Sequence, residues 1–500
     1  MLYFAESESF CTFAAKYSNG MSRIIGRKTE IEELEKLYYS DRSELVVVYG
    51  RRRVGKTFLI KQALKGKFTF QHTGVSPVDQ EDEKNRLKTQ LESFYYSLLN
   101  HGLEGYKQPK TWMEAFFQLE QLLQRLDNGE RMVVFIDELP WMDTPRSGFL
   151  SAFESFWNGW CNGRDNIMLI VCGSATSWIL GKFFRNKGGL YGRVTSDIKV
   201  YPFTLKECEV FFDNEGIELS RYDIVQSQMV FGGIPYYLSY FQKGLSFERN
   251  VDKILFGNRP RLKDEFDRLF KAIFINAGDC KKIVRLLASR HSGFTREEIS
   301  EATGIPLGGG LSDTLKALAE SDFITRYNPH GKPKNVEQYK LIDSFCLFWI
   351  KYVEPSQADA DFMTDNIASD IMKTWRGVAF EEVCWQHVTQ IRKALEIGGV
   401  KSKISAWSLR GDDEKEGAQI DLIIDRNDNI VNLCEMKFAG SEYTITKEEE
   451  LKIRKRIEAL KETLQKKQTV HLTMITTYGV AHGKHSGIVQ KSVTIDDLFD

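Results

Sequence analysis

Three short runs of consecutive apolar residues mark the first two hundred positions of the chain. They are Leu45–Tyr49, the apolar part of Arg131–Glu138, and Ile167–Cys172. Uninterrupted apolar runs of this length are typical of strands in a parallel sheet that is covered on both faces. Helical spacing follows the first run at Thr57–Leu64, and an amphipathic stretch precedes it, with apolar residues at Ile31, Leu34, Leu37 and Tyr38. The pattern predicts an α/β domain.

The middle of the chain is helical in pattern until a hairpin interrupts it. Helices are predicted at Leu205–Glu215 and Tyr222–Phe231, and Gly232–Pro235 breaks the second. The next expected elements are a helix at Cys280–Arg290, a capping box at Thr295–Glu298 that opens a helix to Thr303, a helix at Leu311–Ser321, and a hairpin at Phe323–Leu341 that turns at Asn328–Gly331. This order is typical of a winged helix.

The last part of the chain combines a helix with alternating strands. The helix, Trp375–His387, is expected to place Ala379, Phe380, Val383 and Cys384 on one face. Ala418–Asp425 alternates, with Ile420, Leu422 and Ile424 expected on one side and Gln419, Asp421 and Ile423 on the other. A hairpin turn at Arg426–Asn429 leads to Ile430–Phe438, which places Glu435 and Lys437 on a common face. His471–Thr477 is a plausible closing strand.

Length and composition point to several reduced, globular domains. The chain has 500 residues, a formal net charge of −1, and eight cysteines that form no C-x-x-C pair. No apolar run is long enough to span a bilayer, and a cytoplasmic location is expected. The predicted domain boundaries lie at 20/21, 204/205, 275/276, 353/354 and 372/373, and residues 1–20 are expected to form a loose extension.

The loop after the first predicted strand has the spacing G-x-x-x-x-G-K-[ST]. A strand, this loop and a helix in succession form a phosphate cradle, because glycines let backbone N–H groups turn toward the anion at the start of the helix. Lys56 is expected to reach the β- and γ-phosphates, and the Thr57 hydroxyl to bind Mg²⁺. The nucleotide-binding residues predicted here are Gly50, Arg51, Arg52, Arg53, Val54, Gly55, Lys56, Thr57 and Phe58.

Two further strand ends supply candidates for phosphate chemistry. Asp137 is expected to hold Mg²⁺, and Glu138 to orient and polarise the attacking water. Ser174, after the third strand, is interpreted either as a residue that touches the γ-phosphate or its water, or as a helix N-cap. Arg193 is interpreted either as an arginine finger or γ-phosphate sensor, or as a surface salt-bridge partner.

The segments IIGRKTE, GRRRVGKT, VVFIDELPWM, CGSATSW, LYGRVTSDI and GGIPYYL together resemble the prokaryotic AAA-type ATPases. More narrowly, they are similar to the archaeal and bacterial DEXX-box ATPase family, which is related to the STAND signalling NTPases. The resemblance covers about Ser22–Lys243. It implies that Gly26 and Arg27 flank the adenine pocket and that Gly233 and Pro235 of the helical lid face the nucleotide. It also places Ser174 at the sensor position and favours a nucleotide role for Arg193.

The two strands near residues 420 and 435 suggest a second site. Asp421, Glu435 and Lys437 could converge on one sheet, where two carboxylates would bind a divalent ion and the lysine would position its water. From periodicity alone, two amphipathic strands with ordinary polar faces are the stronger interpretation. The arrangement nevertheless resembles the PD-(D/E)xK nucleases, in which Glu381 matches the first-helix glutamate. Ile420 stands where that family often has proline.

Two basic regions raise the question of DNA as a partner. The hairpin of the predicted winged helix carries Arg326, Lys332 and Lys334, but its second helix has no basic face, so a structural coupling role is favoured. The helix Lys447–Lys467 carries Lys452, Arg454, Lys455 and Arg456, but its interleaved glutamates favour a solvated helix. Any contact with nucleic acid must come from such local patches, because the net charge is close to zero.

Taken together, the residues and the resemblances imply an α/β protein whose P-loop ATPase core, with a parallel NTPase sheet, spans 21–204 and is followed by a helical lid at 205–275. A winged helix-turn-helix domain at 276–353, a linker at 354–372 and a C-terminal α/β restriction-endonuclease-like domain at 373–500, which is nuclease-like, complete the expected division. The expected function is ATP hydrolysis with Mg²⁺, coupled to a metal-dependent DNA nuclease, in defence or mobile-element biology by family analogy. The alternative is an ATP-switched regulator that binds DNA or protein and does not cleave. Oligomerisation or a partner protein is compatible with either.

Overall fold

The structure is a computed structural model that describes residues 24–77, 85–329, 337–356, 359–409 and 418–500. The expected loose extension at 1–20 lies outside the described residues. The chain forms two compact units, Met1–Tyr201 and Pro202–Asp500. The first boundary lies three residues before the predicted one at 204/205. The predicted boundaries at 275/276, 353/354 and 372/373 fall inside the second unit, so the finer division stays a prediction.

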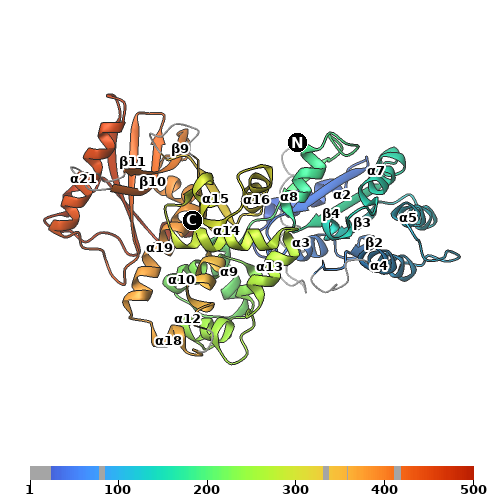
Figure 1. Cartoon of the computed structure of the whole chain (residues 1–500), viewed down its shortest axis with the longest axis horizontal. Coiled ribbons are helices and arrows are strands. Elements are labelled where there is room, and N and C mark those ends of the chain that lie inside the picture. The colour runs from blue at the N-terminus through green and yellow to red at the C-terminus, as the bar shows by residue number, and fades with distance from the viewer. Residues whose placement is uncertain (1–23, 78–84, 330–336, 357–358, 410–417) are drawn as a thin grey trace, which may run out of the picture. The chain divides into compact units, whose positions relative to one another are not determined.

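The first unit is built on a five-stranded sheet with the order β2-β3-β4-β1-β5, in which every neighbouring pair is parallel (Figure 1). The strands are β1 (Glu44–Tyr49), β2 (Phe68–Thr73), β3 (Met132–Asp137), β4 (Ile167–Gly173) and β5 (Ser196–Lys199). The helices are α2 (Lys28–Tyr38), α3 (Lys56–Ala63), α4 (Arg86–Asn100), α5 (Trp112–Leu126), α6 (Leu139–Met142), α7 (Phe149–Gly159) and α8 (Thr176–Ile179). The α/β expectation is confirmed for this unit.

The central strands are buried on both faces, as their uninterrupted apolar sequences predict. All six residues of β1 and of β3 are buried, and so are all seven of β4. Leu45, Val47 and Tyr49 of β1 belong to one aromatic-rich core with α4, α5 and α7. Val46 and Val48 point to the opposite face, since side chains alternate along a strand. The carboxyl ends of β1, β3 and β4 therefore meet at one rigid edge.

His72 of β2 gives the first unit a pH-dependent stability. Burial lowers the pKa of His72 to about 3. Between about pH 3 and pH 6.5, His72 is protonated in the unfolded chain but not in the folded chain. The free energy of unfolding therefore falls as the pH falls below 6.5. We expect a slope of about 1.4 kcal/mol per pH unit from this group. Denaturant unfolding at pH 7 and pH 5 should show this slope, and His72→Leu should remove it. An unchanged slope in that variant, or an equal change in the exposed control His482→Leu, contradicts the prediction.

The second unit opens with a helical array. Its helices are α9 (Leu205–Glu215), α10 (Arg221–Phe231), α11 (Pro235–Leu238), α12 (Phe247–Val251) and α13 (Glu265–Ile273). A capping box of Thr204 and Glu207 opens α9, and Gly232 ends α10 in a left-handed conformation with φ 64°. Pro235 begins α11 at its first turn, where a missing N–H costs nothing. The predicted helices and the predicted break are thus confirmed.

Three helices and a small antiparallel sheet follow. The helices are α14 (Ala277–Ser289), α15 (Arg296–Thr303) and α16 (Gly309–Glu320), and the strands are β6 (Phe294–Thr295), β7 (Ile324–Tyr327) and β8 (Gln338–Leu341), in the order β6-β8-β7. The Thr295–Glu298 capping box forms as predicted. Part of the predicted turn at Asn328–Gly331 lies outside the described residues. The elements occur in the expected order, and their assignment as a winged helix stays a prediction.

The described part of the predicted linker, 354–372, includes structure that packs on the preceding helices. It contains a helical turn, α18 (Phe362–Asp365), whose Phe362 and Met363 are buried. The Asp252 carboxylate accepts hydrogen bonds from the backbone N–H of Met363, at 2.7 Å, and from the Thr364 hydroxyl, at 2.6 Å. Two apolar side chains and one buried acid are enough to dock this turn, and the role of the segment as a linker stays a prediction.

The last part of the chain is a second five-stranded sheet, with the order β13-β12-β11-β10-β9 (Figure 1). The strands are β9 (Ser402–Leu409), β10 (Ala418–Arg426), β11 (Ile430–Lys437), β12 (Thr469–Thr476) and β13 (Lys491–Thr494). The first three strands pair antiparallel and the last three pair parallel. The helices of this part are α17 (Ser344–Phe348), α19 (Asp370–Gln386), α20 (Val388–Ala394) and α21 (Lys447–Thr463). α19 carries the predicted buried face.

A β-bulge in β10 changes which side chains share a face. The pairing with β9 runs from Ile420 opposite Trp407 to Ile423 opposite Ser405, so β10 has one extra residue between them. Ile420 and Ile423 consequently belong to the same core, although strict alternation predicted opposite faces. The prediction was wrong here because a bulge resets the period of two. Asp421 lies within the bulge.

Candidate functional site

The loop between β1 and α3 has the backbone that a phosphate cradle requires. Gly50 has φ 140°, and a Cβ atom there would lie 2.2 Å from the Val200 carbonyl oxygen. Gly55 has φ 91° and precedes the first residue of α3. Any side chain at position 50 would therefore collide with the neighbouring backbone. The helix begins at Lys56 with its N–H groups directed toward the loop, which is a ready-made anion site.

The two residues after the loop face the end of β3. The Lys56 ammonium donates hydrogen bonds to the carbonyl oxygens of Gly50, at 2.9 Å, and Arg51, at 3.0 Å. The Thr57 hydroxyl donates to the Asp137 carboxylate at 2.7 Å. A hydroxyl and a carboxylate that converge in this way are the oxygen donors that Mg²⁺ prefers beside a polyphosphate. The predicted Mg²⁺ pair is thus brought together.

Glu138 is held by Ser174 across the ends of β3 and β4. The Ser174 hydroxyl lies 3.0 and 2.9 Å from the two carboxylate oxygens of Glu138, and its backbone N–H donates to one of them at 3.0 Å. Burial raises the pKa of Glu138, and Lys56 opposes that rise. Helix α8 begins at Thr176 with Ala175 at its N-cap, so the N-cap interpretation of Ser174 is wrong. Ser174 binds the expected catalytic acid instead.

The arginines of the loop have different environments. Arg51 is 2% exposed, whereas Arg52 lies over the Trp141 ring, with 5.1 Å between the guanidinium carbon and the ring centroid. Arg53 has a left-handed backbone, with φ 72°. Val54 is buried, and Phe58 is 46% exposed on α3. The three arginines of the loop thus differ in their surroundings, and their contacts with a nucleotide stay predictions.

The remaining predicted nucleotide residues are dispersed. Gly26 and Arg27 both have left-handed backbones ahead of α2, and Arg27 is buried while donating to the Tyr201 carbonyl. Arg193 lies exposed in a turn before β5, and in the described part of the chain its side chain has no ion pair or hydrogen bond. Gly233 and Pro235 belong to the second unit, where Gly233 lies between α10 and α11 and Pro235 is the first residue of α11. Their roles toward a nucleotide stay predictions.

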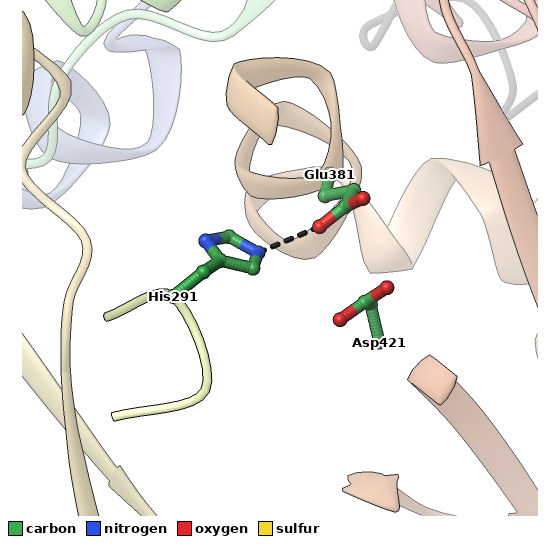
Figure 2. A group of neighbouring side chains, drawn as sticks. All are labelled: His291, Glu381 and Asp421. Atoms are coloured by element: carbon green, nitrogen blue, oxygen red, sulfur yellow. Dashed lines mark ion pairs between the residues drawn. The ribbon is translucent and has the colours of Figure 1, made fainter. Parts of the chain in front are cut away.

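A second cluster of functional side chains lies in the second unit. His291, just after α14, places Nε2 at 2.6 Å from Oε2 of Glu381 on α19. Asp421 completes the group, and one ligand atom from each residue lies within 4.8 Å of the others. Figure 2 shows the three side chains pointing toward one another from a loop, a helix and a strand. The sequence predicted that Glu381 and Asp421 share a site, but it did not predict His291.

Burial dominates the protonation of this cluster. It raises the pKa of Glu381 to about 7 and lowers the pKa of His291 to about 4. Burial also raises the pKa of Asp421, and the neighbouring Glu381 raises it further. Lys340 of β8 lies beside the group, 3.3 Å from Nε2 of His291, but it is paired with Glu382 at 3.1 Å. The cluster thus holds a neutral imidazole and two carboxyl groups that repel each other when charged.

Glu435 and Lys437 lie on one face of β11, as predicted, but Glu435 has its own partner. Arg456 of α21 donates to the Glu435 carboxylate at 2.6 Å. Burial raises the pKa of Glu435, and Arg456 and Lys437 act against that rise. Asp421 also contributes electrostatically to Glu435, and Lys437 to Glu381, so the two groups form one charged neighbourhood. Arg456 therefore faces the site, in contrast to the solvated role expected for its helix.

A cavity of about 220 Å³ adjoins the cluster. Both His291 and Asp421 line it, and several aromatic and amide side chains complete its wall, among them Tyr327, Trp385, Trp407, Gln386 and Gln419. The Trp385 indole N–H donates to the Asp421 carbonyl oxygen at 2.8 Å, which ties the wall to the bulge. A small polar or planar ligand could reach the clustered side chains through this cavity.

The phosphate cradle, the Thr57–Asp137 pair and Glu138 all lie within one family match. Residues 24–241 match the family described as an ATPase domain predominantly from Archaea. The match supports ATP binding and ATPase activity for this part of the chain, as the motifs predicted. It ends before α12, so it leaves the second cluster and the cavity unassigned.

Two relatives come from the archaeon Methanocaldococcus jannaschii. An uncharacterized protein is 27% identical over 421 residues, which cover 83% of this chain and 87% of that protein. A protein named as an uncharacterized ATP-binding protein is 46% identical over 48 residues, which cover 10% of this chain and 81% of that protein.

Two solved structures are also similar. The Walker-type ATPase of Pyrococcus abyssi is 17% identical with a TM-score of 0.42, over 66% of this chain and 96% of that one. The ORC2 protein of Aeropyrum pernix, in its ADPNP–ADP complexes, is 14% identical with a TM-score of 0.41, over 70% of this chain and 98% of that one. Among the described residues, no helix is both long and apolar enough to cross a membrane.

Proposed function

We propose that the ATPase domain acts as a nucleotide-dependent switch that controls a metal-dependent deoxyribonuclease site in the last part of the chain. The nuclease part of this proposal rests on one observation. Glu381 and Asp421 converge beside the strand that bears Glu435 and Lys437. Three acids and a lysine in one charged neighbourhood suit metal-assisted phosphodiester cleavage.

In the ATPase domain, each residue has a definite task. Thr57 and Asp137 would hold Mg²⁺, which spreads the negative charge that develops on the transferred phosphoryl group. Lys56 exchanges its two carbonyl partners for phosphate oxygens. Glu138 orients the attacking water from the end of β3, and Ser174 fixes the direction of its carboxylate.

In the last part of the chain, Glu381, Asp421 and Glu435 would hold a divalent ion, and Lys437 would position the attacking water. The Glu435 carboxylate must exchange Arg456 for the ion, since the two are paired at 2.6 Å. A nucleotide-driven change that moves α21 would free Glu435. We propose that the elements that carry His291, Tyr327 and Lys340, which line part of the cavity, transmit such a change.

A second candidate is an ATP-switched regulator that binds DNA or protein without cleavage. The Arg456–Glu435 ion pair favours it, because an arginine already neutralises one of the acids that the ion requires. A cytoplasmic location, a DNA partner and oligomerisation belong equally to both candidates.

DNA cleavage distinguishes the two candidates. Single- and double-stranded DNA would be incubated with the purified chain, with Mg²⁺ or Mn²⁺, with and without ATP. We expect Glu435→Ala to reduce cleavage by about a hundredfold or more, because one metal-binding carboxylate is lost. The matched control is Glu442→Ala, an exposed acid in the loop after β11 that should leave cleavage unchanged. If the wild type leaves all DNA as intact as the variant does, the non-cleaving regulator replaces the nuclease.

A further inference from the structure

The loop that carries His291 is held firmly against the small sheet. Gly293, two residues on, has φ 80°, and a Cβ atom there would lie 2.5 Å from the Tyr339 carbonyl oxygen. Arg290 donates to the Gly293 carbonyl at 2.7 Å and to Glu298 at 2.6 Å. Only glycine fits this close approach, so the turn fixes the direction in which His291 leaves α14. The imidazole is thereby positioned before any ligand arrives.

Two carboxylates on the last part of the chain lie beside His291, in addition to the Lys340 ammonium at 3.3 Å. Nε2 faces Oε2 of Glu381 at 2.6 Å, and Asp421 supplies a third ligand atom within 4.8 Å of the other two (Figure 2). One imidazole and two carboxylates at this spacing match the three protein ligands of an open metal site. The bulge in β10 turns Asp421 toward the group, and bulges often re-aim a side chain beside a functional site.

Two carboxylates in one group also favour a cation. Lys340, which lies 3.3 Å from Nε2 of His291, pairs with Glu382 at 3.1 Å. Arg456 pairs with Glu435 at 2.6 Å. A divalent ion would bring a counter-charge to Glu381 and Asp421 directly.

The donor set selects the kind of metal. Mg²⁺ and Ca²⁺ prefer oxygen ligands alone, whereas an imidazole nitrogen with carboxylates suits Mn²⁺, Fe²⁺ or Zn²⁺. His291 and Asp421 both line the 220 Å³ cavity, which provides an entry path and room for a ligand at the open position.

We propose that His291, Glu381 and Asp421 bind one divalent transition-metal ion and that this ion joins the residues 277–342 to the last sheet. The inference deepens the proposed nuclease site, on which it rests for Glu381 and Asp421, by adding a ligand from outside the nuclease-like part and by naming the metal class. Packing of the residues 277–342 against the last sheet would then depend on whether the metal site is occupied. Metal binding can be tested even if the protein cleaves no DNA.

The test uses the full chain, stripped with a chelator and free of nucleotide. Mn²⁺ would be titrated and followed by electron paramagnetic resonance, with pulsed detection of imidazole nitrogen coupled to the bound ion. In the wild type we expect one Mn²⁺ site with nitrogen coupling. The affinity for Mn²⁺ should fall by at least about tenfold in His291→Ala and in Asp421→Asn. In His291→Ala the nitrogen coupling should also be absent. The Thr57–Asp137 pair offers oxygen ligands only, so the nitrogen signal separates the two sites.

The control is His485→Ala, because His485 is a partly exposed histidine that pairs with Glu450 at 2.6 Å away from the cluster. It should bind Mn²⁺ as the wild type does. Wild-type affinity in both His291→Ala and Asp421→Asn, or bound Mn²⁺ without nitrogen coupling in the wild type, overturns the inference. Nitrogen-coupled Mn²⁺ in a protein that cleaves no DNA supports the inference and removes only the nuclease proposal.

Discussion

Lys56→Ala is expected to reduce ATP turnover by a factor of about a hundred to a thousand, as the loss of one preorganised donor to a developing charge does elsewhere. The Lys56 ammonium is buried and already lies against the loop carbonyls of Gly50 and Arg51. Alanine removes the ammonium group at the first residue of α3 that is expected to bind the β- and γ-phosphates. Phosphate release at saturating ATP, with the affinity for a fluorescent nucleotide, measures the effect.

The matched control for this variant is Lys61→Ala. Lys61 is an exposed lysine on the same short helix, so the substitution has the same chemistry and a similar effect on helix propensity. It should retain wild-type turnover. If Lys56→Ala hydrolyses ATP as fast as Lys61→Ala, the assignment of the loop as a phosphate cradle is wrong.

Much of the fold was predictable because its signals are local. The strands β1, β3 and β4 have unbroken apolar runs, and the helices α9 and α15 open with complete capping boxes. The loop glycines and Lys56–Thr57 lie within a few residues of one another. Such patterns depend on chain geometry rather than on distant contacts, so a single sequence contains them.

The second cluster could be predicted only in part. Glu381 and Asp421 follow a recognisable arrangement of helix and hairpin, but His291 belongs to another set of elements. No spacing in the sequence indicates that the turn after α14 reaches α19. One local signal does exist. Gly293, two residues after His291, indicates a tight turn, but it does not indicate which element the turn approaches.

Two other predictions differ from the structure for physical reasons that the periodicity of the sequence does not reveal. The bulge at Asp421 adds one residue to β10, and a strict period of two then assigns Ile423 to the wrong face. Arg456 lies among glutamates on a charge-rich helix, which suggested solvent exposure, yet its partner is Glu435 on the neighbouring strand. The packing of distant elements decides which partner a charged side chain contacts, and the local sequence pattern does not contain that information.

Glu138→Gln is expected to lower ATP turnover by about a hundredfold to ten-thousandfold while nucleotide binding persists, because glutamine keeps the shape but cannot accept a proton from water. The Glu138 carboxylate is hydrogen-bonded to Ser174, whereas Thr57 donates to Asp137, so we expect the phosphate cradle and the Thr57–Asp137 pair to remain intact in the variant. Single-turnover hydrolysis, with the nucleotide affinity measured in parallel, separates the two effects. Loss of binding and turnover together contradicts a role confined to the attacking water.

A companion variant, Ser174→Ala, tests how the carboxylate is aimed. It removes the hydroxyl at 3.0 and 2.9 Å from the two oxygens and keeps the backbone N–H at 3.0 Å, so one anchor survives. We expect turnover to fall by about tenfold, the equivalent of one hydrogen bond to a charged group. Ser177→Ala, on α8 three residues away, is the control and should be unchanged. A faster rate in Ser174→Ala would mean that the serine restrains Glu138 in an inactive position instead of directing it at the water.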